Sequence, residues 1–193
     1  SNGAKNCRLI VTVDGRPLDK GVIWSLRQMN VEIIFNKVRG GQVTRTKQLI
    51  ALAKTDILIL AQDDIRFVKN TVHALMAEFE RNSRVTVLAT RVLPEAATTL
   101  LERVVEVGVR LTHRIGDAWN NGDNYLLSSG RCLAFRTAFV KKFTIPEAMI
   151  NSDALFYFEN KRLGGIFKNL ISEVVYNKSP QKLVEHLKQR KKI

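Results

Sequence analysis

The chain has 193 residues, of which 45% are hydrophobic and only 4 are proline, so it can bury a core and does not have the composition of a disordered protein. Its formal net charge of +13 indicates partners that carry phosphate, such as a nucleic acid, an anionic lipid or a nucleotide. No apolar run is long enough for a membrane span or a secretory signal, so we expect a cytoplasmic protein. The two cysteines, Cys7 and Cys132, lack the spacing of a zinc site and fit a reducing compartment.

A single domain is predicted over residues 1–193. Residues 1–6 are expected to be disordered or to derive from a tag, and residues 178–193 to form a basic C-terminal helix. In chain order, strands are predicted at residues 8–13, 31–35, 56–60 and 85–89. Helices are predicted between them at residues 18–29, 44–54 and 68–81. This alternation is typical of an α/β domain with a mostly parallel central sheet and helices on both faces.

The second half of the chain is less regular. A helix is predicted at residues 98–112, through the apolar side chains of Leu101, Val104, Val105 and Val109. The loop at residues 116–124 is rich in glycine, asparagine and aspartate and contains Trp119, which makes it a candidate lip of a substrate site. Further along, strand-like segments flank Gly130. The remaining elements are a short helix at residues 138–143, a helix at 153–163, a strand at 171–176 and a helix at 180–190.

The segment at residues 56–64 is the most informative one for function. An apolar strand, Ile-Leu-Ile-Leu, ends there in two adjacent carboxylates, Asp63 and Asp64. Ligands of α/β sheets bind beyond the carboxyl ends of the strands. Paired carboxylates attract a divalent cation, and a cation held in this way attracts a diphosphate. The alternative is that one of the two residues caps the following helix.

Four segments in this order resemble the catalytic domain of a family-2 glycosyltransferase of the GT-A fold. They are the Asp-Gly-Arg-Pro turn at residues 14–17, residues 39–45 leading into the strand at 56–60, residues 152–156, and residues 175–177 with 189–192. The resemblance spans nearly the whole chain. It implies a single Rossmann-like α/β domain with a mostly parallel sheet.

The resemblance also implies an activity: inverting transfer of a sugar from a nucleoside-diphosphate sugar, of the UDP or GDP type, to a hydroxyl of a glycan or lipid-linked acceptor. It implies Mn²⁺ or Mg²⁺ held by Asp64, with Asp63 as a contact of the nucleotide or the metal shell. Asp153, at a helix start, is the implied catalytic base, and an N-cap role is its alternative. The residues expected to contact the nucleotide sugar are Asp14, Arg16, Asn36, Arg45 and Gln189. For Arg16 and Arg45 the alternative is a solvated basic face.

The chain departs from the family pattern at several positions. Gln62 stands at the first position of the metal motif, and Ser152 replaces the glutamate before Asp153. Asn36 and Lys37 stand where an acidic residue usually contacts the base. At the terminal motif, Lys192-Ile193 replaces Arg-Trp, and a lysine holds phosphate as a point charge rather than bidentately. These departures motivate the alternative of a catalytically weakened, glycosyltransferase-like binding module.

The positive charge leaves two further hypotheses. A basic nucleic-acid-binding α/β domain is less favoured, because no recognised binding motif accompanies the charge, and no nucleic-acid partner is expected. Residues 180–192 could form an amphipathic helix that rests on an anionic membrane surface, which would add a peripheral location at the inner membrane face. The alternatives for that helix are packing on the domain and closure over the donor diphosphate.

Overall fold

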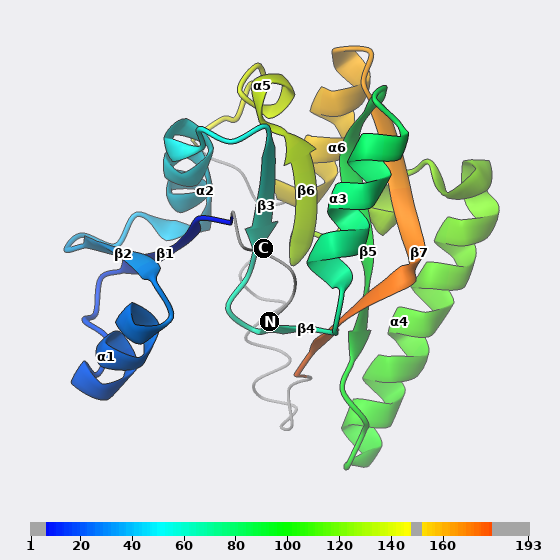
Figure 1. Cartoon of the computed structure of the whole chain (residues 1–193). Coiled ribbons are helices and arrows are strands. Elements are labelled where there is room, and N and C mark those ends of the chain that lie inside the picture. Colours follow the sequence, from blue (N-terminus) through cyan, green and yellow to red (C-terminus); the bar gives the residue numbers. More distant parts are fainter. Residues whose placement is uncertain (1–6, 148–151, 179–193) are drawn as a thin grey trace.

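The computed structural model describes residues 7–147 and 152–178 (Figure 1). The residues outside these ranges include Gln189 and the predicted C-terminal helix. The strands are β1 (Leu9–Asp14), β2 (Val31–Asn36), β3 (Ile57–Ala61), β4 (Ile65–Phe67), β5 (Val85–Pro94), β6 (Cys132–Arg136) and β7 (Ile166–Asn177). The helices are α1 (Lys20–Gln28), α2 (Gly41–Leu52), α3 (Thr71–Arg81), α4 (Leu100–Ala118), α5 (Thr137–Val140) and α6 (Ser152–Arg162), and two 3₁₀ turns lie at Trp119–Gly122 and Tyr125–Leu127.

The central sheet has five strands in the order β3-β6-β5-β7-β4. β5 and β7 are parallel, whereas β6 is antiparallel to β3 and β5, and β4 is antiparallel to β7. The sheet is therefore mixed, and the prediction of a mostly parallel sheet is wrong. The segment between α4 and β6 causes the difference, because it returns the chain to the end of the sheet where β3 stops. Cys132 pairs there with Ala61, so β6 starts at the carboxyl end of β3.

Helices cover both faces of the central sheet, as predicted. Side chains alternate between the two faces of a strand, and the core divides accordingly. On one face, Leu75 and Phe79 of α3 pack on Leu88 of β5. On the other face, α2, α5 and α6 pack on Phe135 of β6 and on Phe167 of β7. Figure 1 shows α3 in front of the sheet and α4 along its outer side, beside β5 and β7.

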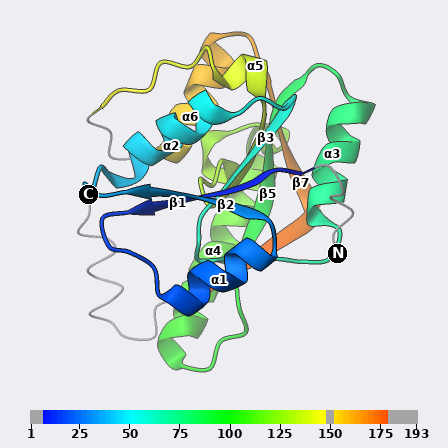
Figure 2. The same ribbon diagram turned by 60° about the vertical axis from the view of Figure 1, so that its left-hand side comes forward.

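The first two strands form a small parallel sheet of their own, with Leu9 opposite Val31. In both views α1 and α2 lie on opposite sides of this sheet (Figure 2). Helix α2 joins it to the main body, because Ile50 is buried in the core together with Val140 and Phe143. The Lys141 ammonium adds a hydrogen bond to the Ala53 carbonyl at 2.7 Å. Helix α2 thus ties the β1–β2 unit to the part of the core that lies beside β3 and α5.

Several predicted boundaries are too short. Strand β5 continues from Ala89 to Pro94, β7 begins at Ile166, and α4 runs on through the predicted loop to Ala118. The extensions of β5 and β7 support each other, since the two strands pair in parallel over most of their length. Helix α4 continues because its last turns are held by neighbours far along the chain, including Leu127 against Gly116.

The N-terminus of α4 is closed by a capping box. The Thr99 hydroxyl accepts from the Glu102 N–H, and the Glu102 carboxylate accepts from Thr98 Oγ1 at 2.7 Å, Thr98 N–H at 2.7 Å and Thr99 N–H at 2.9 Å. These hydrogen bonds, first among them the one from the Thr98 hydroxyl, lower the pKa of Glu102 to about 2. The ionised carboxylate therefore stabilises the folded protein.

A pH-dependent stability difference follows from this depressed pKa. Glu102→Ala should lower the free energy of unfolding, measured by urea denaturation. The decrease should be largest above pH 4.5, which is the ordinary pKa of a glutamate. Because the pKa is lower in the folded state, the difference from wild type should shrink as the pH falls toward 2. The control is Glu80→Ala in α3, which removes an exposed carboxylate of the same type. A difference that is constant from pH 7 to 3 would contradict the proposed role of Glu102.

Candidate active site at the carboxyl end of β3

The predicted carboxylate pair lies where β3 leaves the sheet. Strand β3 ends at Ala61, and the Gln62 N–H donates to the Arg131 carbonyl at 3.0 Å. This contact places the residue before β6 beside the Asp63–Asp64 turn. Arg131 Nε lies 3.5 Å from Asp64 Oδ2, and the two side chains are 36% and 41% exposed. Asp63 is exposed. Both ends of this ion pair are therefore open to a ligand.

The predicted base lies against the neighbouring residue of the same segment. Asp153 is in the first turn of α6, and its backbone carbonyl accepts from Ser128 Oγ at 2.8 Å. A Cβ atom placed on Gly130 would lie 2.0 Å from Asp153 Oδ1, so the carboxylate packs directly on the Gly130 backbone. Asp153 therefore meets Gly130, and Asp64 meets Arg131. The two predicted acids thus contact adjacent residues of this Gly-Arg dipeptide.

A methyl group at Gly130 should disturb this arrangement. We expect Gly130→Ala to displace the Asp153 carboxylate. The rate of a reaction in which Asp153 acts as the base should then fall about 10²-fold, since misplacement of a reacting group by about 1 Å can lower a rate by that factor. Gly108→Ala is the control, because a Cβ at that helical position meets no atom within 4 Å. Circular dichroism would check that both variants are folded. An unchanged rate in folded Gly130→Ala would show that the position of Asp153 is not important for the reaction.

Three of the predicted donor residues form one network between β1, β2 and α2. Asp14 accepts from the N–H groups of Gly40 at 3.0 Å and Gly41 at 2.8 Å, and from Arg45 Nε at 2.9 Å. These hydrogen bonds, led by that of Gly40, hold the pKa of Asp14 below its ordinary value. Asn36 Oδ1 accepts from Gln48 Nε2 at 3.2 Å. The network fixes the two turns that follow β1 and β2.

The remaining donor predictions have different outcomes. Arg45 is only 17% exposed and also donates to the Val38 carbonyl at 2.9 Å, so the alternative of a solvated basic face is wrong for it. Arg16 is exposed in the turn after β1, and its side chain has no hydrogen-bond or ion-pair partner among the described residues. Arg16 and Asp63 thus lie open to solvent, whereas Asp14, Asn36 and Arg45 are engaged by the framework. Gln189 lies outside the described residues.

The chemistry of the site sets the kind of metal it could hold. Within residues 7–147 and 152–178, no cluster of three or more potential metal-ligating side chains occurs. Mg²⁺ is commonly held by one or two carboxylates together with substrate phosphates. Asp64 fits that arrangement, since its carboxylate is half-exposed and Asp63 is adjacent. The residues therefore fit a cation shared with a diphosphate, and do not form a closed site for a resident ion.

Sequence reasoning missed Arg131. It stands directly before β6, in a segment whose direction was not predictable, and only the antiparallel pairing of β6 with β3 brings it to Asp64. A guanidinium is a bidentate ligand of phosphate, so Arg131 adds a second cationic group to the place predicted for a diphosphate. The signal that could have found it is its position next to Gly130, a residue already recognised between two strand-like segments.

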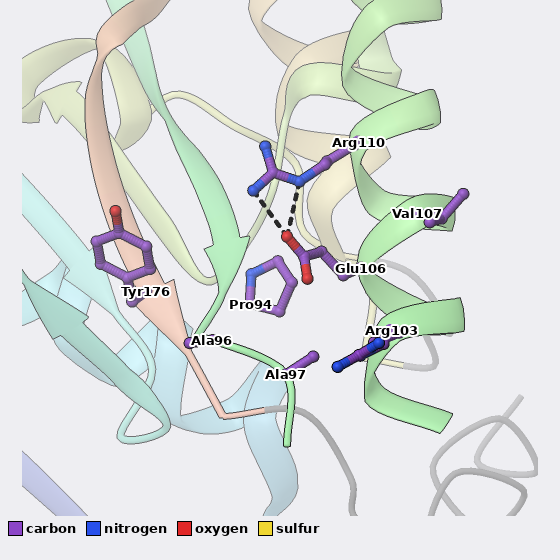
Figure 3. Close-up of a pocket in the computed structure, with 8 residues that line it drawn as sticks. All are labelled: Pro94, Ala96, Ala97, Arg103, Glu106, Val107, Arg110 and Tyr176. Atoms are coloured by element: carbon purple, nitrogen blue, oxygen red, sulfur yellow. Dashed lines mark hydrogen bonds and ion pairs between the residues drawn. The ribbon is translucent and has the colours of Figure 1, made fainter. Parts of the chain in front are cut away.

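An open pocket of about 590 Å³ lies at the same end of the sheet (Figure 3). Pro94 and Tyr176 border it from the ends of β5 and β7, and Arg103, Glu106 and Arg110 border it from α4. Pro94 pairs with Asn177, which also pairs with Ile65 next to Asp64. The pocket and the Asp64–Arg131 ion pair therefore lie at the same end of the sheet. Arg110 Nε donates to Glu106 Oε1 at 2.8 Å, whereas the Arg103 guanidinium on the same wall has no ion-pair partner within residues 7–147 and 152–178.

Comparison with known proteins supports the fold. No protein-family model and no curated protein sequence matches the chain. Among solved structures, it is similar to the mannosyltransferase PcManGT from Pyrobaculum calidifontis, determined in complex with GDP-Man and Mn²⁺, with a TM-score of 0.64 and 11% identity over 95% of this chain and 51% of that one. It is also similar to a mycobacterial protein, with a TM-score of 0.60 and 15% identity over 92% of this chain and 59% of that one.

These similarities show a shared α/β fold of the kind seen in a GDP-mannose glycosyltransferase. The chain spans between one half and three fifths of the two structures it matches. The class of fold that was predicted is therefore confirmed in its coarse form, as a mixed α/β domain resembling a glycosyltransferase.

Proposed function

We propose that the chain is the catalytic domain of a metal-dependent, inverting glycosyltransferase of the family-2 type. It would transfer a sugar from a nucleoside-diphosphate sugar to a hydroxyl of a glycan or lipid-linked acceptor. The observation that carries the proposal is that Asp64 pairs with Arg131 and Asp153 packs on Gly130, two adjacent residues beside the carboxyl end of β3. The fold shared with a mannosyltransferase gives independent support and makes a GDP-sugar the first donor to test.

The residues divide the reaction between them. The Asp153 carboxylate takes the proton of the acceptor hydroxyl as the acceptor oxygen bonds to the anomeric carbon. The bond from that carbon to the diphosphate oxygen breaks in the same step, and the diphosphate leaves with the electron pair from the opposite face. Arg131 can bind the leaving group as a guanidinium. A divalent cation supplies charge neutralisation to the diphosphate, and Asp64 would hold it, with Asp63 beside it.

The donor-side network has a supporting role in this proposal. Asp14, Asn36 and Arg45 hold the turns after β1 and β2 in place, and Arg16 extends from the first turn into solvent. We place the nucleotide along these turns, with Arg16 and Asp63 as direct contacts of the donor. Gln189 stays a predicted donor contact.

A donor panel tests the proposal. We expect one class of nucleotide sugar, UDP- or GDP-linked, to raise the melting temperature more strongly when Mn²⁺ is present, by roughly 5–10 °C at about 100 times its Kd. The alternative of a weakened binding module is favoured by one observation, the pairing of Asp64 with Arg131, which opposes the binding of a cation. That alternative predicts stabilisation by a donor that does not depend on Mn²⁺, without any release of nucleoside diphosphate. Absence of stabilisation with both donor classes would refute the proposal.

A further inference from the structure

The outward side of α4 carries an apolar stripe. Its members are Leu100, Val104, Val107, Leu111 and Ile115, which are between 50% and 79% exposed. Their spacing of three or four residues places them within about 80° on an ideal helix, along a length of about 22 Å. In Figure 3, Glu106 and Arg110 point toward the pocket, and Val107, which also borders the pocket, points away from the sheet. The stripe therefore faces away from the core of the described domain.

The helix is fixed in this orientation by contacts on its inner side. A His113 ring nitrogen lies 3.0 Å from the Val92 carbonyl, Asp117 is ion-paired with Arg91, and Gly116 packs against Leu127. A Cβ at Gly116 would lie 2.5 Å from the Leu127 side chain, so the backbone approaches closely there. These contacts prevent the stripe from turning inward, and its exposure is a property of the fold.

Exposed aromatic residues continue the stripe beyond the end of α4. Trp119 follows the helix directly, and its ring lies 5.6 Å from that of Tyr125, which lies 5.6 Å from that of Phe158. All three are between 39% and 54% exposed. We call the stripe and these three aromatic residues together the α4 face. Tryptophan and tyrosine are enriched where proteins meet the interface of a bilayer.

The charge beside the stripe is positive. On an ideal helix, Arg103, Arg110 and Arg114 fall within about 60° of the stripe, all on one flank. The carboxylates of the helix are engaged: Glu102 in the capping box, Glu106 with Arg110, and Asp117 with Arg91. An apolar stripe with an arginine flank is the pattern of a helix that lies in the plane of a membrane interface.

We propose that the α4 face docks on an anionic lipid bilayer, with the stripe in the headgroup and acyl boundary and the arginines at the lipid phosphates. A second copy of the chain fits less well. Antiparallel pairing of two α4 helices would bring their arginine flanks together, and α4 offers no unengaged carboxylate to neutralise them. None of the helices in residues 7–147 and 152–178 is long and apolar enough to cross a bilayer.

Vesicle sedimentation tests the docking. The full chain should bind vesicles that contain about one third anionic lipid, and binding should weaken with salt and be absent on neutral vesicles. Val107→Glu, within the stripe, should abolish binding, and changing Arg103, Arg110 and Arg114 together to Gln should lower the partition coefficient about 100-fold. The controls are Val38→Glu, at another exposed valine, and a triple change of Lys20, Arg27 and Lys69 to Gln, which removes the same charge elsewhere.

Each other outcome overturns the proposal in a distinct way. If changing Lys188, Lys191 and Lys192 to Gln removes binding while Val107→Glu leaves it intact, the C-terminal segment is the docking element. If wild type does not bind vesicles and Val107→Glu converts a dimer to a monomer in gel filtration, the α4 face pairs with a second copy. If both control variants lose binding to the same extent as the α4 variants, the attraction is a general effect of net charge.

Discussion

Asp153→Asn is expected to lower the rate of sugar transfer about 10²–10⁴-fold while the affinity for the donor stays near that of wild type. Asparagine has the size of aspartate and can keep the contact with Gly130, but its amide cannot accept the proton of an acceptor hydroxyl at neutral pH. Steady-state kinetics with a saturating donor would give the rate, and calorimetry with the same donor would give the affinity.

The matched control for this variant is Asp56→Asn, an exposed residue at the opposite end of β3. It makes the same chemical change at an exposed residue before β3, away from Gly130, and should leave the rate unchanged. If Asp153→Asn turns over at the wild-type rate, another group removes the proton, and the assignment of Asp153 as the base is wrong.

Asp64→Ala should abolish the part of the donor-induced thermal shift that depends on Mn²⁺, while the protein stays folded. The variant removes the carboxylate proposed to hold the cation and also releases Arg131 from its ion pair. Any stabilisation by donor alone should therefore persist or increase, because the freed guanidinium can still bind diphosphate. Differential scanning fluorimetry with donor, with Mn²⁺ and with both separates these contributions.

Asp56→Ala is again the control, since it removes a carboxylate from the other end of the same strand. An Asp64→Ala protein that keeps the full Mn²⁺-dependent shift would show that the cation is held elsewhere. The ion pair with Arg131 would then be the sole role of Asp64 at this edge.

Local sequence patterns predicted the elements that depend on local physics. The apolar run before Asp63 forms β3, and the helix that carries Asp153 begins at Ser152, one residue before its predicted start. The positions of both acids at the ends of elements were therefore predictable. The contacts of Asp64 with Arg131 and of Asp153 with Gly130 were not predictable, because they depend on the return of the chain to the end of β3 before β6.

Contacts between distant segments account for the other differences. Asp14 was predicted to contact the donor, yet its carboxylate is occupied by N–H groups at the start of α2, which no local pattern places near it. In α4 the apolar residues occupy two sides of the helix, and periodicity cannot tell which side is buried. Val104 is one of the apolar residues from which the helix was predicted, and it is exposed on the α4 face.

Turnover of the donor tests the central claim most directly. The measurement is release of nucleoside diphosphate from GDP- and UDP-sugars by the wild-type protein with Mn²⁺, with hydrolysis as the reaction when no acceptor is added. We expect release from one donor class that stops with a chelator and in Asp64→Ala, and that falls about 10²–10⁴-fold in Asp153→Asn. A folded protein that releases no nucleoside diphosphate from either donor class, with or without Mn²⁺ and with glycan or lipid-linked acceptors present, would contradict the assignment of a glycosyltransferase site.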